Sequence, residues 1–347
     1  MKNKAELSSL PARTKLIPCG CKAELSSLPA RTKLMSSGGK IRLALIAGGK
    51  SGEREVSLAG AKEVEKALSQ EKYEVRRYDP ATDLAQLVID AAQIDMAFIL
   101  LHGPLGEDGT MQGFLDLLEI PYQGAGVLGS ALAMDKNLAK IIYRQAGLTV
   151  AAWEMAQLTD QANPRRLLER LSLPVVIKPV RQGSSLGMSL ARNEDELILG
   201  LAKAFAYDNA VMVEQYVLGR EITGGVLGSN ELTALPIVEI IPGEEYAFFD
   251  YDAKYKKGAS KEVCPAELPA EITARAQEIA LVAHRALQLK GYSRTDMIVA
   301  ADGIYVLETN TIPGMTPTSL LPQAAAVHGL SFTALLDRLI ELALVEK

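Results

Sequence analysis

The sequence is poor in cysteine, in tryptophan and in long apolar runs. Its 347 residues include three cysteines and one tryptophan. So few cysteines exclude a disulfide-stapled scaffold and suit a reducing compartment, so we expect a cytoplasmic protein. No apolar run approaches the about 18–20 residues that a membrane span requires. The sequence therefore gives no reason to expect a membrane partner.

Positive charge is also scarce. The chain has 37 Lys and Arg against 42 Asp and Glu, a formal net charge of −5. It therefore lacks the overall basic field that attracts nucleic acid. Hydrophobic residues make up 48% and charged residues 23%, an ordinary globular balance. At about 100–200 residues per domain, the length allows two or three domains.

The first forty residues differ from the rest. Residues 4–16 read KAELSSLPARTKL, and residues 22–34 repeat the same letters. Two copies cannot form a repeat fold, which needs about three or more units, and each copy contains a proline. A targeting arm is one interpretation, but the apolar stretch of a secretory signal is missing. We favour a duplicated or mis-started tail, with Met35 as an alternative start, and predict that residues 1–40 are disordered and carry no catalytic role.

After this tail, short apolar segments alternate with helical patterns. We expect strands at 41–47, 73–78 and 96–101, and helices at 56–69 and 84–91. Such alternation indicates a parallel, doubly wound sheet, and we assign an N-terminal Rossmann-like substrate domain to residues 41–124. Ligands of such sheets bind beyond the carboxyl ends of the strands. Two polar, glycine-rich loops, 48–57 and 102–109, lie at those ends.

Two further units complete the predicted α/β architecture. We assign a central domain to 125–214, with a helix at 135–145 and strands at 174–180 and 210–217. A C-terminal domain, 215–347, has strands at 221–227 and 232–241, a helix at 270–289 and a hairpin at 295–310. The polar stretch 243–262 is long for a plain connection, and we predict that it is a lid loop.

The hairpin at 295–310 carries three oxygen-bearing side chains. Glu308 and Asn310 are two residues apart, so on a strand they point to one face. A three-residue turn with Gly303 in the left-handed conformation places Asp296 opposite Glu308, whereas a two-residue turn at Asp302 and Gly303 does not. We expect the longer turn. The two carboxylates and the amide oxygen on this face suit Mg²⁺ that is shared with phosphate oxygens. The alternative is that this face of the hairpin is exposed to solvent and binds nothing.

Polar groups in three loops are further candidates. Lys178 opens a glycine–serine loop, 178–187, whose backbone N–H groups can approach phosphate; a plain turn is the alternative, since the Walker pattern is absent. His102 ends a strand and either fills a structural role or faces a ligand. Glu53 either favours the start of a helix through the helix dipole or holds a substrate ammonium group.

Taken together, these segments resemble the D-alanine–D-alanine ligases of the ATP-grasp superfamily. The resemblance extends over about residues 41–347 and rests on several motifs in one order. They are GGKSGEREVS, HGPLGEDGT, AMDK, VVIKPVRQGSSLGM, VEQYV, DYDAKY, SRTD and LETNTIPGMTPTSLLP. Each motif alone is modest support, but the complete series is highly specific.

The resemblance implies an ATP-grasp fold of three domains around a cleft, with ATP between the second and third. It implies that one D-alanine attacks the γ-phosphate of ATP, and that the amine of a second D-alanine then displaces phosphate from the acyl phosphate. Such a protein supplies D-alanyl-D-alanine for peptidoglycan. ATP is a substrate, two Mg²⁺ ions (with Mn²⁺ as a substitute) assist, and the partners are D-alanine and a second copy in a homodimer.

The resemblance also assigns roles residue by residue. The residues implied in ATP binding are Lys136, Lys178, Ser185, Glu214, Gln215, Val217, Glu221 and Lys254. The implied metal ligands are Asp296, Glu308 and Asn310. The implied catalytic residues are Glu53, Ser184, Tyr255, Arg294 and Gly314. The residues implied in amino-acid binding are His102, Ser319 and Leu320. Tyr255 in the lid is expected to bond Ser184, which is expected to bond Glu53.

Two alternatives stay open from the sequence. The first is a ligase with another acceptor, D-serine or D-lactate, although the Lys254-Tyr255 pair in the lid favours an amine over D-lactate. The second is a catalytically silent nucleotide-binding protein. A silent protein usually lacks part of the metal set, and here Asp296, Glu308 and Asn310 are all present.

Overall fold

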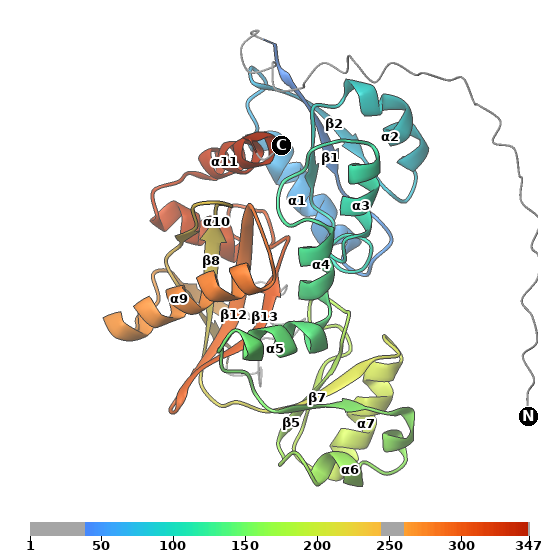
Figure 1. The fold of residues 1–347 in the computed structure, drawn as a ribbon, viewed down its shortest axis with the longest axis vertical. Coiled ribbons are helices and arrows are strands. Elements are labelled where there is room, and N and C mark those ends of the chain that lie inside the picture. Colours follow the sequence, from blue (N-terminus) through green and yellow to red (C-terminus); the bar gives the residue numbers. More distant parts are fainter. Residues whose placement is uncertain (1–38, 244–259, 346–347) are drawn as a thin grey trace, which may run out of the picture.

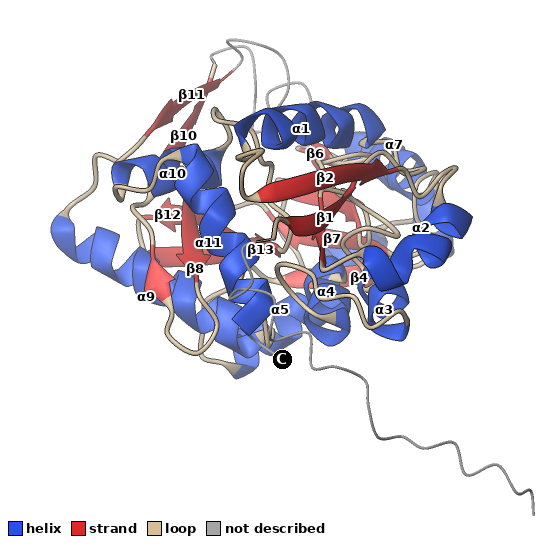
Figure 2. Ribbon diagram, turned by 90° about the horizontal axis from the view of Figure 1, so that it is seen from above, coloured by secondary structure: helices blue, strands red, loops and turns tan. Residues whose placement is uncertain are grey.

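The computed structural model describes residues 39–243 and 260–345. The first unit is a three-stranded parallel sheet in the order β2-β1-β3, with helices on both faces (Figures 1 and 2). Its elements are β1 (Ile41–Ile46), α1 (Arg54–Ala67), β2 (Tyr73–Tyr78), α2 (Leu84–Asp90), β3 (Met96–Ile99) and α3 (Thr110–Leu117). The doubly wound sheet predicted from the alternating pattern is confirmed.

Alternate side chains of β1 enter different cores, as the two-residue period of a strand requires. Leu43 and Leu45 pack in the core that contains α1, whereas Ala44 and Ile46 pack in the core that contains α2 and α3. The last helix, α11 (Phe332–Val345), joins the α1 side and lies beside α1 in Figure 1. The last helix of the described chain therefore covers one face of the N-terminal sheet.

The central unit is a four-stranded antiparallel sheet in the order β4-β7-β5-β6. Its elements are β4 (Trp153–Ala156), α6 (Arg165–Leu168), β5 (Val175–Pro179), β6 (Ser189–Ala191), α7 (Glu194–Phe205) and β7 (Val211–Gln215). Asn193 caps α7 by accepting the N–H of Glu196, and the acidic first turn of this helix complements the helix dipole. Helix α7 and the sheet share a separate apolar core.

The C-terminal unit is a six-stranded antiparallel sheet in the order β11-β10-β8-β12-β13, with β9 on β8. Its strands are β8 (Arg220–Leu227), β9 (Thr233–Ala234), β10 (Val238–Pro242), β11 (Ser260–Val263), β12 (Tyr292–Ala300) and β13 (Gly303–Asn310). Its helices are α9 (Ala270–Ala286) and α10 (Leu320–Val327). The expected strand at 232–241 is two strands, because Pro236 has no N–H to donate to a ladder.

Two helices between the first and second units pack on the C-terminal sheet. They are α4 (Val127–Met134) and α5 (Lys136–Gln145). Ala133 and Tyr143 share a core with Ile222 of β8 and Ala283 of α9. Although the sequence grouped these helices with the central unit, their apolar faces therefore join the C-terminal core. Asp135 caps α5 by accepting the N–H groups of the next turn.

The hairpin β12–β13 pairs Asp296 with Glu308, as predicted, but through a different turn. Ala300 pairs with Gly303, so the turn contains two residues and the predicted three-residue turn is wrong. A bulge between Asp296 and Met297 supplies the missing shift of register.

Several predicted features lie wholly or mostly outside the described residues. The tail, 1–40, is described only at its last two residues, and the stretch 243–262 only at 243 and in the part that forms β11. Among the residues that are described, no helix has the length and apolar character that a membrane span needs.

Candidate active site

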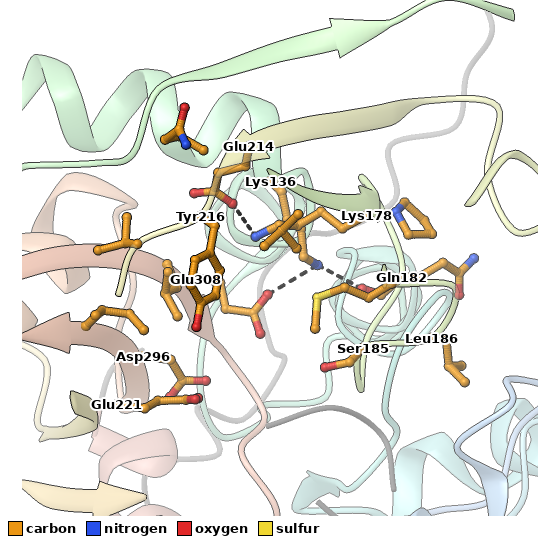
Figure 3. A pocket seen from close by; sticks show the side chains of 17 residues that line it. Lys136, Lys178, Gln182, Ser185, Leu186, Glu214, Tyr216, Glu221, Asp296 and Glu308 are labelled. Atoms are coloured by element: carbon orange, nitrogen blue, oxygen red, sulfur yellow. Dashed lines mark hydrogen bonds and ion pairs between the residues drawn. The ribbon is translucent and has the colours of Figure 1, made fainter. Parts of the chain in front are cut away.

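A solvent-open pocket lies between the central and C-terminal sheets (Figure 3). Its walls come from β5, the loop after β5, β7 and the β12–β13 hairpin. It contains seven of the eight residues implied in ATP binding, namely Lys136, Lys178, Ser185, Glu214, Gln215, Val217 and Glu221. The eighth, Lys254, lies outside the described residues. Asp296 and Glu308 also line this pocket.

The pocket has apolar walls that the sequence reasoning did not assign. They include Val176 of β5, Ile298 of β12 and Leu307 of β13, together with Met188 and Tyr216. Apolar and aromatic walls with a few polar groups at one end are typical of a site for a flat organic ring. The alternation of apolar and polar residues in these strands indicated one apolar face for each strand. The sequence alone did not show whether that face lines the pocket or the core.

Glu214 is buried between two lysines. Its carboxylate forms ion pairs with Lys140 of α5 and with Lys178 of β5. Burial alone would raise the pKa of Glu214, but Lys178 and Lys140 together lower it. Burial opposes the charged form of Lys178, yet the attraction of Glu214 outweighs it and raises the pKa of Lys178. The three side chains therefore form one charged cluster at the pocket wall.

Lys136 is the second cation that faces the pocket. Its Nζ lies 3.3 Å from Oε2 of Glu308 and donates to the carbonyl oxygen of Gln182 at 2.8 Å. Figure 3 shows these contacts, with Lys136 and Lys178 approaching from different elements. The two lysines bring positive charge to one end of the pocket, as binding of a polyphosphate requires.

The carboxylate of Asp296 is held by three neighbours. Arg294 donates to it from Nε at 2.9 Å and from Nη2 at 2.8 Å. Thr223 Oγ1 donates to it at 2.6 Å, and Asn310 Nδ2 donates at 3.0 Å. The side chain is buried, so the alternative of a solvated outer face is wrong for Asp296. Arg294, Asp296, Glu308 and Asn310 lie along one end of the hairpin.

The opposite face of the hairpin is anchored to α5. Tyr143 of α5 donates its hydroxyl to Thr309 Oγ1 at 2.7 Å, and Thr309 lies 3.0 Å from Thr295 Oγ1. All three side chains are buried. This contact fixes the hairpin relative to the helix that carries Lys136, so the acidic and basic groups of the pocket are positioned together.

Glu53 occupies the N-cap position of α1 but does not cap the helix. Ser184 donates its hydroxyl to the Glu53 carboxylate, which is the predicted contact between these residues. Ser184 and Ser185 have φ values of 47° and 58°, a conformation that costs non-glycine residues energy and clusters at functional sites. A Cβ added at Gly183 would lie 2.5 Å from Oε2 of Glu53. The glycine–serine loop thus closes directly over Glu53.

Glu107 is a site residue that the sequence reasoning missed. Its carboxylate accepts the N–H of Gly103 at 2.8 Å and the N–H of Ile312 at 3.3 Å, so it joins the N-terminal unit to the end of the β13 segment. Burial first, and the nearby Glu53 second, raise the pKa of Glu107 to about 8. Its position in the motif HGPLGEDGT was the available signal.

His102 lies buried near the start of the loop that follows β3. Burial, and then the charge of Arg294, lower the pKa of His102 to about 4, although a hydrogen bond to the backbone of Ile312 opposes this shift. The imidazole is therefore neutral at neutral pH. Its proximity to Arg294 brings it near the hairpin, which the sequence did not establish.

A second, smaller pocket adjoins the first. Lys136, Gln182 and Glu308 line both pockets, and Glu107, Gly183 and Asn310 line the second. The first pocket therefore continues toward the carboxylates of the N-terminal unit. Within residues 39–243 and 260–345, no three His, Cys, Asp or Glu side chains group closely enough to form a metal site by themselves.

The remaining predicted residues lie near the end of the hairpin. Ser319 is the N-cap residue of α10, and its Oγ lies 2.8 Å from Thr316 Oγ1. Leu320 is the buried first residue of α10. A Cβ at Gly314 would lie 3.1 Å from Ser319 Oγ, so these positions are neighbours. None of the three lines either pocket, and Tyr255 lies outside the described residues.

The side chain of Gln215 is used structurally. It donates to the carbonyl oxygens of Ser172 at 2.7 Å and Pro174 at 3.0 Å, and it accepts the N–H of Ser172 at 3.1 Å. Its amide is therefore committed to the segment that precedes β5. Gln215 lines the pocket, but this side chain is not free to recognise a ligand.

The central and C-terminal antiparallel sheets enclose a pocket lined by paired lysines and carboxylates, and this arrangement defines an ATP-grasp enzyme. Family models described as D-ala D-ala ligase N-terminus and D-ala D-ala ligase C-terminus match residues 81–125 and 142–341. Together they span well over half of the sequence. The chain belongs to the D-alanine–D-alanine ligase family.

Individual relatives agree with this assignment. The D-alanine--D-alanine ligase of Desulfotalea psychrophila is 60% identical over 306 residues, covering 88% of this chain and 95% of the relative. The enzyme of the same name from Syntrophobacter fumaroxidans is 58% identical over 304 residues, covering 88% of this chain and 98% of the relative.

Solved structures of the family have the same fold. The D-alanine--D-alanine ligase from Bacillus anthracis complexed with ATP is 36% identical with a TM-score of 0.77, covering 88% of this chain and 98% of that one. The VanG D-Ala:D-Ser ligase from Enterococcus faecalis is 32% identical with a TM-score of 0.75, covering 88% of this chain and 100% of that one.

Proposed function

We propose that this chain joins two D-alanine molecules to D-alanyl-D-alanine for peptidoglycan precursors, with ATP converted to ADP and phosphate through a D-alanyl phosphate. The observation that carries the proposal is the junction of the two pockets at Lys136, Gln182 and Glu308. A polyphosphate that extends from the apolar pocket reaches this junction, where the smaller pocket begins. Transfer of a phosphoryl group between two bound reactants requires such a meeting point.

For the nucleotide, the apolar walls receive the adenine beside Glu214, Gln215 and Val217. Because the side chain of Gln215 is committed to the preceding loop, its main chain makes the contribution. Glu221 lies near the ribose. Lys136, Lys178 and the left-handed Ser185 of the glycine–serine loop contact the phosphates.

The metal set is Asp296, Glu308 and Asn310, proposed to hold two Mg²⁺ ions. Two carboxylates and an amide oxygen fit this hard cation, and the two carboxylates pair with Arg294 and Lys136. When bound, Mg²⁺ would neutralise charge on the transferring phosphoryl group.

For the first D-alanine, Glu53 is proposed to bind the ammonium group. Ser184 orients Glu53 through its hydroxyl. Neutral His102, beside Arg294, adjoins the same substrate and donates or accepts a hydrogen bond rather than repelling the ammonium group. The substrate carboxylate then lies free to attack phosphorus.

For the second step, Arg294 and the backbone N–H of Gly314 are proposed to stabilise the tetrahedral oxyanion. Each such donor typically contributes about 10²–10³ in rate. Ser319 and Leu320, at the start of α10, receive the carboxylate of the second D-alanine. Lys254 and Tyr255 are proposed to close the site and exclude water, because acyl phosphates hydrolyse.

A cytoplasmic homodimer is also proposed. Support for the dimer comes from apolar side chains exposed on three consecutive helices, α3, α4 and α5. They are Leu117, Val127, Leu128, Leu138 and Ile141. Exposed apolar side chains that form one patch are typical of subunit contacts, and the proposal is that these five form such a patch. Light scattering should give twice the monomer mass, and charged substitutions at Leu117 and Leu128 should return it to the monomer.

The test of the activity is phosphate release from ATP and Mg²⁺ with D-alanine, D-serine, D-lactate and L-alanine, offered singly and in pairs. We expect release with D-alanine alone, with D-alanyl-D-alanine as product. Release only when D-serine joins D-alanine would instead support the D-Ala:D-Ser specificity named for the Enterococcus faecalis structure. No release from folded protein that binds ATP would support the silent scaffold.

A further inference from the structure

Lys140 is a buried cation to which no role has been assigned. It lies on α5 four residues after Lys136, its side chain is 1% exposed, and its Nζ is paired with Glu214. It does not line the nucleotide pocket, whereas Glu214 and Lys178 do. Glu214 therefore lies between Lys140 and the pocket, and Lys140 does not contact a ligand bound in the pocket.

The position of Lys140 changes the charge that the pocket presents. Glu214 has two carboxylate oxygens, of which Oε1 meets Lys140 and Oε2 meets Lys178. With one lysine, the pair would be neutral, and the buried carboxylate would hold that lysine tightly. With two, the cluster keeps one net positive charge, and the attraction of Glu214 is shared.

We propose that Lys140 is a positioning residue that neutralises Glu214 from behind, so that Lys178 remains available to the phosphates of the nucleotide. This inference rests on the proposed ATP-dependent function and adds a residue to it. Lys140 touches neither substrate nor reacting atoms. It acts on Lys178 through their common partner, Glu214.

The surroundings of Lys140 hold it in this position. Its Nζ lies 5.5 Å from the centroid of the ring of Trp153, a cation–π contact with a residue that does not line the pocket. Trp153 in turn donates Nε1–H to Asn137 Oδ1 at 2.9 Å. Trp153 is also the residue of β4 that pairs with Glu214 of β7. Burial lowers the pKa of Lys140, while Glu214 opposes that shift.

The first experiment compares the affinities of wild type and Lys140→Met for ATP and for adenosine by calorimetry, with Mg²⁺ present. We expect ATP to bind at least about tenfold more weakly to the variant, because Glu214 then retains Lys178. Adenosine, which has no phosphates, should change by less than about twofold. Lys62→Met, which removes an exposed lysine on α1, is the matched control and should bind both ligands as wild type does.

The second experiment adds Glu214→Gln to Lys140→Met. Removing the carboxylate frees Lys178, so the ratio of ATP to adenosine affinity should return toward that of wild type. An additive further loss in this ratio would overturn the proposal. So would an equal loss of ATP and adenosine affinity in Lys140→Met, which indicates a merely structural role.

A third variant covers the case in which Lys140→Met does not fold. Lys140→Gln keeps a hydrogen-bond donor toward Glu214 but no charge, and it should show the same selective loss for ATP. Normal ATP affinity in folded Lys140→Gln would refute the role of charge. Because wild type alone decides whether D-alanyl-D-alanine is made, failure here is distinct from failure of the proposed function.

Discussion

At the scale of single residues, Glu107 gives the site a dependence on pH. Its folded-state pKa is raised from 4.5 to about 8. The stabilising contribution of the protonated form is complete below the unfolded value and is lost as pH rises through the folded value. Glu107 therefore makes the folded protein progressively less stable as pH increases across this window.

We predict that Glu107→Gln removes this part of the pH dependence. The melting temperature of the variant relative to wild type should rise as pH increases from about 5 to about 9. In the amide, one of the two backbone N–H groups meets a nitrogen instead of an oxygen, so the variant loses one of the two hydrogen bonds that the ionised carboxylate accepts. Scanning fluorimetry across this range measures the difference, and a difference independent of pH would contradict the assignment.

Glu308 is the residue that both pockets share with the proposed metal site. Glu308→Ala removes a metal ligand and the partner of Lys136, so turnover should fall by at least about 10²-fold. The fold should persist, because Glu308 is partly exposed. Circular dichroism and phosphate release measure the two outcomes, with the exposed Glu231→Ala as control. Near-normal turnover in Glu308→Ala would refute the metal assignment.

The sequence predicted those site residues that belong to a motif. It did not predict residues whose role depends on being buried beside a distant partner. Asp296, Glu308 and Asn310 could be grouped by strand period and resemblance. Lys140 reads as an ordinary helical lysine, because its partner Glu214 is 74 residues away in sequence. Its burial follows from contacts with Glu214 of β7 and Trp153 of β4, which no local pattern contains.

At the scale of elements, the sequence predicted most of the strands but fewer than half of the helices. It did not predict the strands β4, β6 and β11 or the helices α3, α4, α6, α7, α10 and α11. The bounds of β2 (Tyr73–Tyr78) were predicted without error, and those of β1 and β5 within two residues. In the hairpin, the predicted pairing of Asp296 with Glu308 was correct, but the predicted three-residue turn was wrong. A bulge and an added turn residue shift register by the same amount, and side-chain alternation alone cannot distinguish them.

Helix α11 provides a prediction at this scale. Leu339 is fully buried between this helix and the core of the N-terminal sheet. Leu339→Ala should reduce the free energy of unfolding by about 2–5 kcal/mol, because it leaves a cavity in that core. Leu199→Ala is the matched control on α7, where the side chain is 71% exposed. Urea denaturation measures both, and equal effects would contradict the packing of α11.

At the scale of the whole molecule, we predict that the duplicated segment at the start of the sequence is dispensable for the enzyme. The family matches begin at residue 81, and relatives nearly complete in length align with 88% of this chain. A variant lacking residues 1–38 should therefore keep the activity and melting temperature of the full chain. Phosphate release and calorimetry compare the two proteins, and a loss of more than about twofold in activity would assign the segment a role.

The arrangement of the three units also explains what the whole sequence could not predict. Motifs at Glu53, Lys178 and Asp296 lie in different units. Residue patterns alone predicted each environment separately, and only the family resemblance implied the contact of Ser184 with Glu53. Their meeting depends on long-range packing, in which α5 joins the C-terminal core and the glycine–serine loop contacts Glu53. Such contacts are set by complementary surfaces rather than by period or propensity.

Because α11 covers the first sheet, the ribosome must make the beginning of this protein long before it makes the helix that completes it. Strand β3 ends at Ile99 and α11 begins at Phe332. At roughly 5–20 residues per second, translation leaves this face of the sheet covered by α1 alone for on the order of ten to fifty seconds. The nascent chain therefore presents a binding surface for chaperones throughout that interval, and a message truncated before α11 yields a protein destined for proteolysis.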